Sequence, residues 1–258
     1  MNALELQRVV KEFDNQVRAV DDLTMSVPQG SIFGFIGLNG AGKTTTIRII
    51  AGLSGRDSGE IRIFGENIDA HPRDLKRELG FVLDEPMYFD WMNAREYLGF
   101  VGAMQELAPQ EARLRTEELI AFFDLDEKAG SPIRTFSTGM KKKISLASAM
   151  IHRPRLIILD EPLEGIDAVA AAAIKESLAL MASKGSTIFI TSHVLDTVEK
   201  FCTEIAIIHR GKILIQCATS HIRAQTAGLL GNAPYRSLEE LFIGLVGRER
   251  MSKQLSWL

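Results

Sequence analysis

The sequence is poor in cysteine and has no long apolar runs. Only two of its 258 residues are cysteines, Cys202 and Cys217, and their separation matches no metal-binding or redox spacing. That usage is typical of a protein in a reducing compartment. The longest apolar runs, such as LIIL at 156–159, are far too short to span a bilayer. These shortages argue against a disulfide scaffold and an integral membrane protein.

An excess of one charge sign is also missing. The formal net charge is −3 at pH 7, so no global basic field points to nucleic acid as a partner. The first residues, MNALELQRVVKEF, lack the unbroken apolar core of a signal peptide. We therefore expect a cytoplasmic protein that binds no nucleic acid. If it works at a membrane, another chain must supply the membrane part.

The hydrophobic pattern predicts alternating strands and helices. Residues 3–10 and 17–27 are typical of an antiparallel hairpin around the polar turn DNQ. Further strands are expected at 31–36, 60–64, 79–83, 155–159, 187–191, 204–209 and 211–216. Helices are expected at 43–51, 169–182 and 194–201, with three more helical segments between 93 and 151. This layout predicts an α/β protein with a mixed sheet and one inserted helical block.

The strongest motif is GLNGAGKTT, which fits G-x-x-x-x-G-K-[ST] between a buried strand and a helix. Glycines let the backbone wrap a phosphate, and the N–H groups and helix dipole attract its charge. Lys43 would reach the β- and γ-phosphates, and the Thr44 hydroxyl would ligate Mg²⁺. The alternative is a chance glycine turn. The predicted nucleotide loop comprises Gly37, Leu38, Asn39, Gly40, Ala41, Gly42, Lys43, Thr44 and Thr45.

A second motif, RLIILDEP at 155–162, places two acids directly after a buried strand. The carboxyl ends of strands are where α/β sheets bind ligands. Asp160 would orient Mg²⁺ through its water shell, and Glu161 would act as general base for the attacking water. The alternative is that both acids belong to a solvated loop.

His193 lies in TSH, between a predicted strand and a predicted helix. Two readings remain open for it. It would cap the helix, or it would contact the γ-phosphate and hold the attacking water beside Glu161.

Two further motifs are FSTGMKKKISLA at 136–147 and EGID at 164–167. Together with GLNGAGKTT, LIILDEP and TSH they make five motifs, and in the order and spacing of these five the sequence resembles the ATP-binding-cassette ATPases over residues 1–216. The resemblance implies a P-loop NTPase core, an antiparallel β subdomain and a helical subdomain at about 85–152. A tail at 217–258 would carry a helix at about 237–247, where SLEELFIGLVG has a capping box and helical spacing.

In that family two cassettes sandwich two ATP molecules, each held by one chain's nucleotide loop and the other chain's signature. The resemblance assigns the signature to Ser137, Thr138, Gly139 and Met140, with Ser137 as the helix N-cap. The lysines at 141–143 would add positive potential there or remain solvated. Phe13 matches the aromatic residue that stacks on adenine, although Phe13 taken alone indicates a core residue rather than a ligand contact. Asp167 belongs to the loop that EGID forms.

Two motifs depart from the family pattern, the signature and VLDEP at 82–86. Thr138 replaces a glycine and Met140 a glutamine, which adds bulk beside the contact across the dimer. Asp84 stands where the family has a glutamine that touches Mg²⁺ and the attacking water, in a loop that faces the membrane partner. Because a carboxylate also ligates Mg²⁺, we expect activity to be retained but altered.

The resemblance implies an ATPase subunit that uses ATP and Mg²⁺ to power a transporter by closing and opening a cassette dimer. Its partners would be a second copy of the chain and integral membrane subunits of an exporter, which would hold it at the cytoplasmic face. A cassette that drives a soluble machine is the alternative, but no heptad array lies between Lys43 and Asp160. A nucleotide sensor with weak hydrolysis is a third reading, suggested by Asp84 and Thr138.

Overall fold

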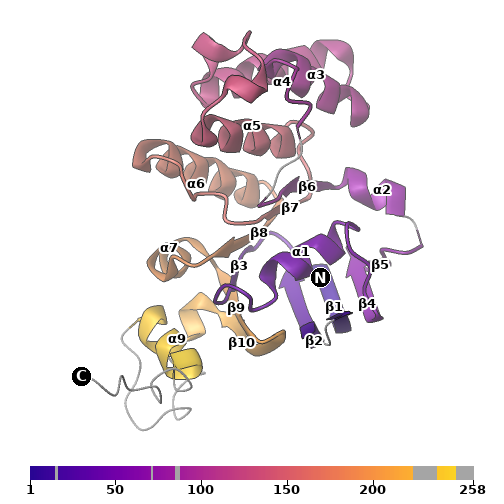
Figure 1. Cartoon of the computed structure of the whole chain (residues 1–258), viewed down its shortest axis with the longest axis vertical. Helices are drawn as coiled ribbons and strands as arrows, with labels where there is room; N and C mark the ends of the chain where they lie inside the picture. The colour runs from indigo at the N-terminus through magenta and orange to yellow at the C-terminus, as the bar shows by residue number, and fades with distance from the viewer. Residues whose placement is uncertain (15–16, 71, 85–87, 223–236, 248–258) are drawn as a thin grey trace. The chain divides into compact units, whose positions relative to one another are not determined.

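The computed structural model describes residues 1–14, 17–70, 72–84, 88–222 and 237–247 (Figure 1). The chain divides into two compact units. We name the units by their place in the sequence. The outer unit comprises the two end segments, Met1–Gly65 and Thr191–Leu258, and the middle unit comprises the segment between them, Glu66–Ile190. Parts of three expected features lie outside the described residues: the turn at 15–16, the start of the helical subdomain at 85–87, and the tail at 223–236 and 248–258.

The outer unit begins with an antiparallel sheet in which β1 (Asn2–Phe13) pairs with β2 (Val17–Pro28) and β4 (Ser58–Ile63). The predicted hairpin is therefore confirmed. Strand β1 continues three residues past the predicted end, because Asp57 fastens that segment. The Asp57 carboxylate accepts the backbone N–H of Glu12 at 2.6 Å and the ammonium of Lys11 at 3.2 Å.

A second set of strands in the outer unit positions the nucleotide loop. Strand β3 (Ile32–Ile36) is parallel to β9 (Glu204–His209), and β10 (Lys212–Ala218) is antiparallel to β9. All five residues of β3 are buried, which explains its uninterrupted apolar sequence. The loop after β3 leads into helix α1 (Lys43–Ile50).

Helices α7 (Leu195–Phe201) and α9 (Leu238–Val246) complete the outer unit and pack against each other. Ser237 caps α9 by accepting the N–H of Glu240 at 3.3 Å. The carboxylate of Glu199 on α7 accepts the backbone N–H of Leu238 at 3.0 Å, so the first turn of α9 is bonded to α7.

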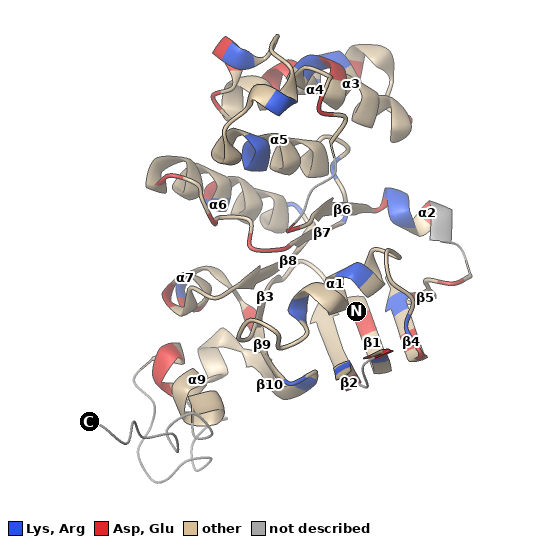
Figure 2. Cartoon of the chain, in the orientation of Figure 1, with Lys and Arg blue, Asp and Glu red and all other residues tan. Residues whose placement is uncertain are grey.

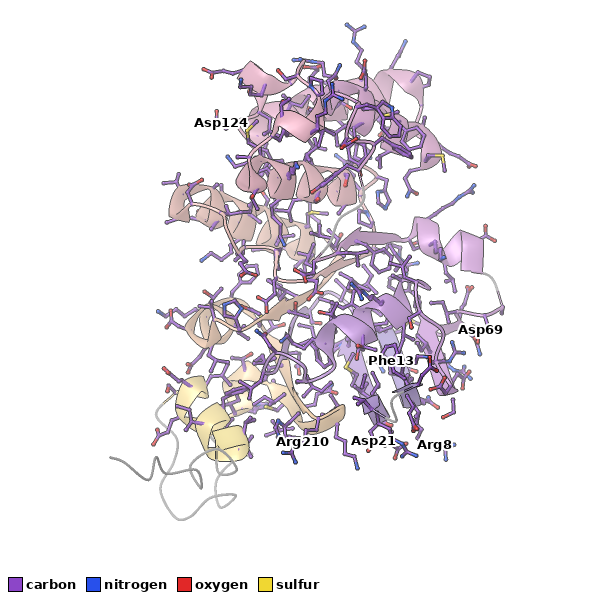
Figure 3. The ribbon with its side chains drawn as sticks, in the orientation of Figure 1. Arg8, Phe13, Asp21, Asp69, Asp124 and Arg210 are labelled. Carbon is purple, nitrogen blue, oxygen red and sulfur yellow. The ribbon has the colours of Figure 1, made fainter. Side chains whose placement is uncertain are left out.

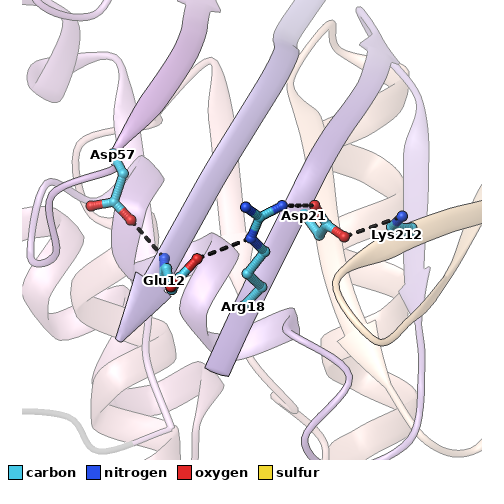
Figure 4. Close-up of polar contacts among 5 residues, drawn as sticks. All are labelled: Glu12, Arg18, Asp21, Asp57 and Lys212. Atoms are coloured by element: carbon cyan, nitrogen blue, oxygen red, sulfur yellow. Dashed lines mark hydrogen bonds and ion pairs between the residues drawn. The ribbon is translucent and has the colours of Figure 1, made fainter. Parts of the chain in front are cut away.

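An ion-pair network links the hairpin to β10 (Figure 4). Arg18 bonds Glu12 at 2.9 Å and Asp21 at 3.3 Å, and Asp21 also pairs with Lys212 at 3.1 Å. The pairing with Lys212 lowers the pKa of Asp21, and the N–H of Glu12 lowers the pKa of Asp57. These charges are exposed, so each pair contributes little stability. The network mainly sets where the ends of β1 and β2 lie.

The middle unit contains a parallel set of strands, in which β7 (Leu156–Leu159) pairs with β6 (Leu79–Val82) and with β8 (Thr187–Ser192). Every residue of β7 is buried. The other strand and the helices of this unit are β5 (Glu66–Asn67), α2 (Pro72–Arg77), α3 (Ala94–Met104), α4 (Pro109–Phe122), α5 (Thr138–Met150) and α6 (Ala168–Ser183).

Helices α3, α4 and α5 are the three helical segments predicted from the sequence. Helix α3 begins with a capping box, because the Asn93 side chain accepts the N–H of Glu96 while the Glu96 carboxylate accepts the N–H of Asn93. Helix α4 has Pro109 in its first turn, which explains the predicted break before it. The α/β class with an antiparallel sheet and an inserted helical block is thus confirmed. No helix within the described ranges is long and apolar enough to cross a membrane.

Candidate nucleotide site

The loop at 37–45 depends on glycine at two close approaches. A Cβ on Gly37 would lie 2.6 Å from the carbonyl oxygen of Ile208, and one on Gly42 would lie 2.3 Å from that of Ala19. Gly42 is also left-handed, with φ of 112°, and is the N-cap of α1. No other residue type fits either position without moving strand backbone. The loop therefore lies tightly between β3 and α1, with N–H groups free of side-chain bulk, which is the arrangement that cradles a phosphate.

Lys43 is held inside this loop. Its side chain is 7% exposed, and its ammonium donates to the carbonyl oxygens of Gly37 at 2.7 Å and Leu38 at 3.3 Å. A cation so far from water must be hydrogen-bonded. Phosphate oxygens are charged and accept more strongly than carbonyls, so an incoming phosphate would compete for this ammonium.

The hydroxyls that follow Lys43 differ in their roles. The Thr46 hydroxyl donates to the carbonyl of Gly42 at 2.8 Å and is buried, so it serves the helix. Thr44 and Thr45 are half-buried in the first turn of α1, and Ala41 is buried behind them. Asn39 and Gly40 are exposed at the loop tip. Thr44 therefore suits the predicted contact with Mg²⁺.

Phe13 is labelled in Figure 3 at the end of β1, where it is 46% exposed. The reading of Phe13 as a core residue is therefore wrong. The ammonium of Lys11 lies 5.5 Å from the centroid of the ring, within cation–π range. One face of an exposed ring held in this way is suited to stacking on a planar base.

His193 is exposed and lies directly after β8. The N-cap of α7 is Val194 and has no side-chain cap, so the reading of His193 as a helix cap is wrong. The local turn is closed instead by Ser192, whose hydroxyl accepts the N–H of Val194 at 3.0 Å. His193 therefore does not cap α7.

In the middle unit, β7 delivers Asp160 and Glu161. Asp160 is 1% exposed and its N–H donates to the carbonyl of Val82 at 2.8 Å, so it is not part of a solvated loop. Glu161 has a left-handed backbone, with φ of 45°. Such a conformation costs a non-glycine residue about 1–3 kcal/mol and is concentrated at functional sites.

The oxygen ligands present suit Mg²⁺ bound together with phosphate. In the part of the chain that the structure describes, no three His, Cys, Asp or Glu side chains are grouped so as to hold a metal ion. Mg²⁺ typically takes one or two carboxylates and completes its shell with water and substrate phosphates. Thr44 in the outer unit carries a hydroxyl and Asp160 in the middle unit carries a carboxylate, and each group by itself is of the kind that Mg²⁺ takes as a ligand.

Helix α5 begins at the predicted signature. Ser137 and Thr138 are exposed, and the Ser137 hydroxyl accepts the N–H of Met140 at 3.3 Å as the N-cap. A hydroxyl that accepts one bond still has its own hydrogen to donate. Capping and an anion contact are therefore compatible. A Cβ on Gly139 would lie 3.3 Å from the carbonyl oxygen of Gly165, so the helix start packs closely on the loop after Asp160.

Lys142 on α5 makes a specific contact that the sequence did not predict, since the sequence did not distinguish it from Lys141 and Lys143. Its ammonium donates to the carbonyl oxygen of Asp160 at 3.3 Å. Burial lowers the pKa of Lys142, and the nearby carboxylates oppose that shift: Asp84, Asp160, Glu164 and Glu161. Figure 2 shows basic residues on α5 and acidic residues along the segment before α6. Helical spacing could have indicated that Lys142 faces the protein, because residue 142 shares a helix face with the buried Ser145 and Leu146.

Asp84 and Asp167 occupy the other two predicted loops. Asp84 is exposed just after β6. Asp167 is the N-cap of α6 and accepts the N–H of Ala170 at 2.9 Å, which lowers the pKa of its carboxyl. Asp167 therefore has a structural role whether or not it meets a ligand. The middle unit thus brings Asp84, Asp160 and Glu161 close to α5, and the outer unit carries Phe13, residues 37–45 and His193.

Comparison with known proteins shows the family of the chain. The profile of a family described as ABC transporter matches residues 20–164. The bacitracin transport ATP-binding protein BcrA of Bacillus licheniformis is 35% identical over 207 residues, covering 80% of this chain and 67% of that protein. The linearmycin resistance ATP-binding protein LnrL of Bacillus subtilis is 36% identical over 211 residues, covering 82% and 68%. A solved ATP-binding subunit of an ABC transporter superposes with a TM-score of 0.86 and 32% identity, covering 94% of this chain and 99% of that one.

Proposed function

The chain belongs to the ABC transporter family, as one of its ATP-binding ATPase subunits, and on that premise we propose that it powers the export of a small molecule. The observation that carries the ATPase assignment is the glycine loop at 37–45, which holds the buried Lys43 at the start of α1. Export is proposed because the relatives are named for bacitracin transport and linearmycin resistance.

In the proposed reaction, the loop at 37–45 binds the phosphates of ATP through its N–H groups. The Lys43 ammonium exchanges the carbonyl of Gly37 for β- and γ-phosphate oxygens. Phe13 stacks on the adenine. Thr44 and Asp160, the latter through water, would hold Mg²⁺, which would supply a Lewis acid that draws electron density from the phosphate oxygens. Asp84 is proposed as a further ligand in place of an amide.

Glu161 is proposed as the general base. Its carboxylate takes a proton from water while the water oxygen attacks the γ-phosphorus and the bond to the β–γ bridging oxygen breaks. His193 is proposed to contact the γ-phosphate and to hold that water in line. The left-handed backbone of Glu161 is consistent with a carboxylate that is held in a required orientation.

We propose that two copies of the chain form the working ATPase. Ser137, Thr138, Gly139 and Met140 would face the γ-phosphate held by the second copy, and ATP would close the dimer. Membrane subunits of the transporter would bind the cassettes on the cytoplasmic face.

Two measurements test this function. Purified protein should release phosphate from ATP with Mg²⁺, and Lys43→Ala should abolish that release. A tagged copy should also bring down an integral membrane protein from mild detergent. Recovery of ribosomes or nucleic acid in place of a membrane protein would overturn transport in favour of a soluble machine. ATP binding without turnover would indicate a nucleotide sensor.

A further inference from the structure

Helix α5 makes three contacts with the segment that follows β7. Gly139 lies so close to the carbonyl of Gly165 that a Cβ would be 3.3 Å from that oxygen. Lys142 bonds the carbonyl of Asp160 at 3.3 Å. The charge of Lys143 helps to lower the pKa of Asp167. Gly139 lies about one turn before Lys142 and Lys143, so two successive turns of α5 face the segment from Asp160 to Asp167.

Lys142 is hydrogen-bonded to the peptide group that joins Asp160 to Glu161. The carbonyl of Asp160 belongs to the peptide whose N–H is that of Glu161, so a bond to this oxygen fixes the peptide plane before Glu161. The plane after Glu161 is fixed as well, because its carbonyl accepts the N–H of Glu164 at 3.3 Å. With both flanking planes bonded, Glu161 is held at its φ of 45°.

Left-handed residues other than glycine persist only where the surroundings impose that conformation. A charged donor to a carbonyl is stronger than a neutral one, and half-burial of Lys142 reduces competition from water. Lys142 also brings a positive charge close to the four carboxylates whose charges act on it. It therefore opposes the mutual repulsion that would spread the segment apart.

We propose that Lys142 is a positioning residue that holds the Asp160–Glu161 peptide from the signature helix. The role for catalysis rests on the proposed function of Glu161, while the effect on the backbone does not. A displacement of α5 would then change the backbone position of Glu161 through the side chain of Lys142, since both residues belong to the middle unit.

Hydrogen–deuterium exchange of the full-length protein without nucleotide tests the backbone effect. In Lys142→Met, amides of residues 160–167 should exchange roughly fivefold faster or more, because a charge-assisted bond is lost. Amides of the loop at 37–45 should be unaffected. Lys142→Arg keeps a charged donor and should restore most of the protection. Lys142→Gln is a second uncharged variant, should the methionine variant fold poorly.

Lys141→Met is the matched control. It removes the same charge from the neighbouring position, which points about 100° away around the helix. Its exchange at residues 160–167 should resemble that of the unaltered protein. Equal exchange in all variants would overturn the proposal and leave Lys142 as a solvated lysine.

Phosphate release at saturating ATP provides the second readout. Lys142→Met should lower turnover by about 10- to 100-fold, as a misplaced catalytic group does, with little change in ATP affinity. Faster exchange with unchanged turnover would overturn the catalytic part of the proposal. If the unaltered protein does not hydrolyse ATP, the proposed function fails, and the exchange experiment still decides the role of Lys142.

Discussion

The ammonium of Lys43 donates a hydrogen bond to the carbonyl oxygen of Gly37 at 2.7 Å, closing the nucleotide loop on itself. The loop is thus shaped by its own residues, with its cation bonded at the site where a phosphate is proposed to bind. We expect the binding of ATP to exchange this carbonyl acceptor for a stronger one.

Lys43→Ala removes that cation, and Ser137→Arg puts bulk at the exposed start of α5 while removing its cap. In a homodimer, each altered protein alone has two defective sites and should be nearly inactive. A mixed dimer has one site that combines the intact loop of the Ser137→Arg chain with the intact signature of the Lys43→Ala chain. Mixing should therefore restore phosphate release, or ATP-dependent dimerisation if hydrolysis requires two working sites.

Circular dichroism controls for folding in that experiment. If Ser137 serves only as a helix cap, Ser137→Arg should melt at a lower temperature and mixing should restore nothing. Two well-folded variants that recover neither hydrolysis nor dimerisation when mixed would rule out a signature that acts on the partner's nucleotide.

Glu161→Gln keeps the shape of the side chain but removes the base. Turnover should fall by roughly 10²–10⁴, the usual contribution of a general base, while ATP still binds. Because hydrolysis no longer separates the copies, an ATP-bound dimer should appear in size-exclusion chromatography. Unchanged turnover would remove Glu161 from the mechanism.

Asp84 is predicted to act through Mg²⁺. Asp84→Gln restores the residue usual in the family and should be tolerated, whereas Asp84→Ala removes a ligand and should raise the Mg²⁺ concentration for half-maximal hydrolysis. Titration of phosphate release with Mg²⁺ measures this. One shared Mg²⁺ dependence for all three proteins would make Asp84 an ordinary loop residue.

Phe13→Ala removes the proposed stacking surface. Base–aromatic stacking contributes about 1–3 kcal/mol, so the dissociation constant for ATP should rise by about 5- to 150-fold. Phe13→Trp should bind nearly as well as the original protein. Val17, the exposed cross-strand neighbour of Phe13, provides the control, since Val17→Ala alters the same hairpin end without removing the ring. Equal affinity in Phe13→Ala would exclude stacking.

Glu199→Ala removes the carboxylate that accepts the N–H of Leu238. The first turn of α9 should loosen at a cost of about 1 kcal/mol, the net value of such a bond. Faster hydrogen exchange confined to α9 would show it, with Glu239→Ala on the same helix as the comparison. Unchanged exchange would mean that apolar packing alone holds α9 on α7.

The sequence by itself determined the family and the local elements. Glycines at 37, 40 and 42 before Lys43 predict a phosphate loop, and the apolar run before Asp160 predicts a buried strand, because both patterns depend only on residues close in the chain. The hairpin and the three helices between 94 and 150 followed from the same local rules, whereas the cap at Ser137 was implied by the family resemblance.

Tertiary structure decided what depends on residues far apart in the chain. Phe13 is apolar and is therefore of the type found in cores. It is nevertheless exposed, because Asp57, more than forty positions later, extends β1. His193 does not cap α7, since the turn after β8 leaves Val194 in that place. The three lysines after FSTGM look alike in sequence, yet only the position of β7 sets Lys142 against the Asp160 carbonyl. Pairings of this kind depend on distances in space, which local sequence patterns do not encode.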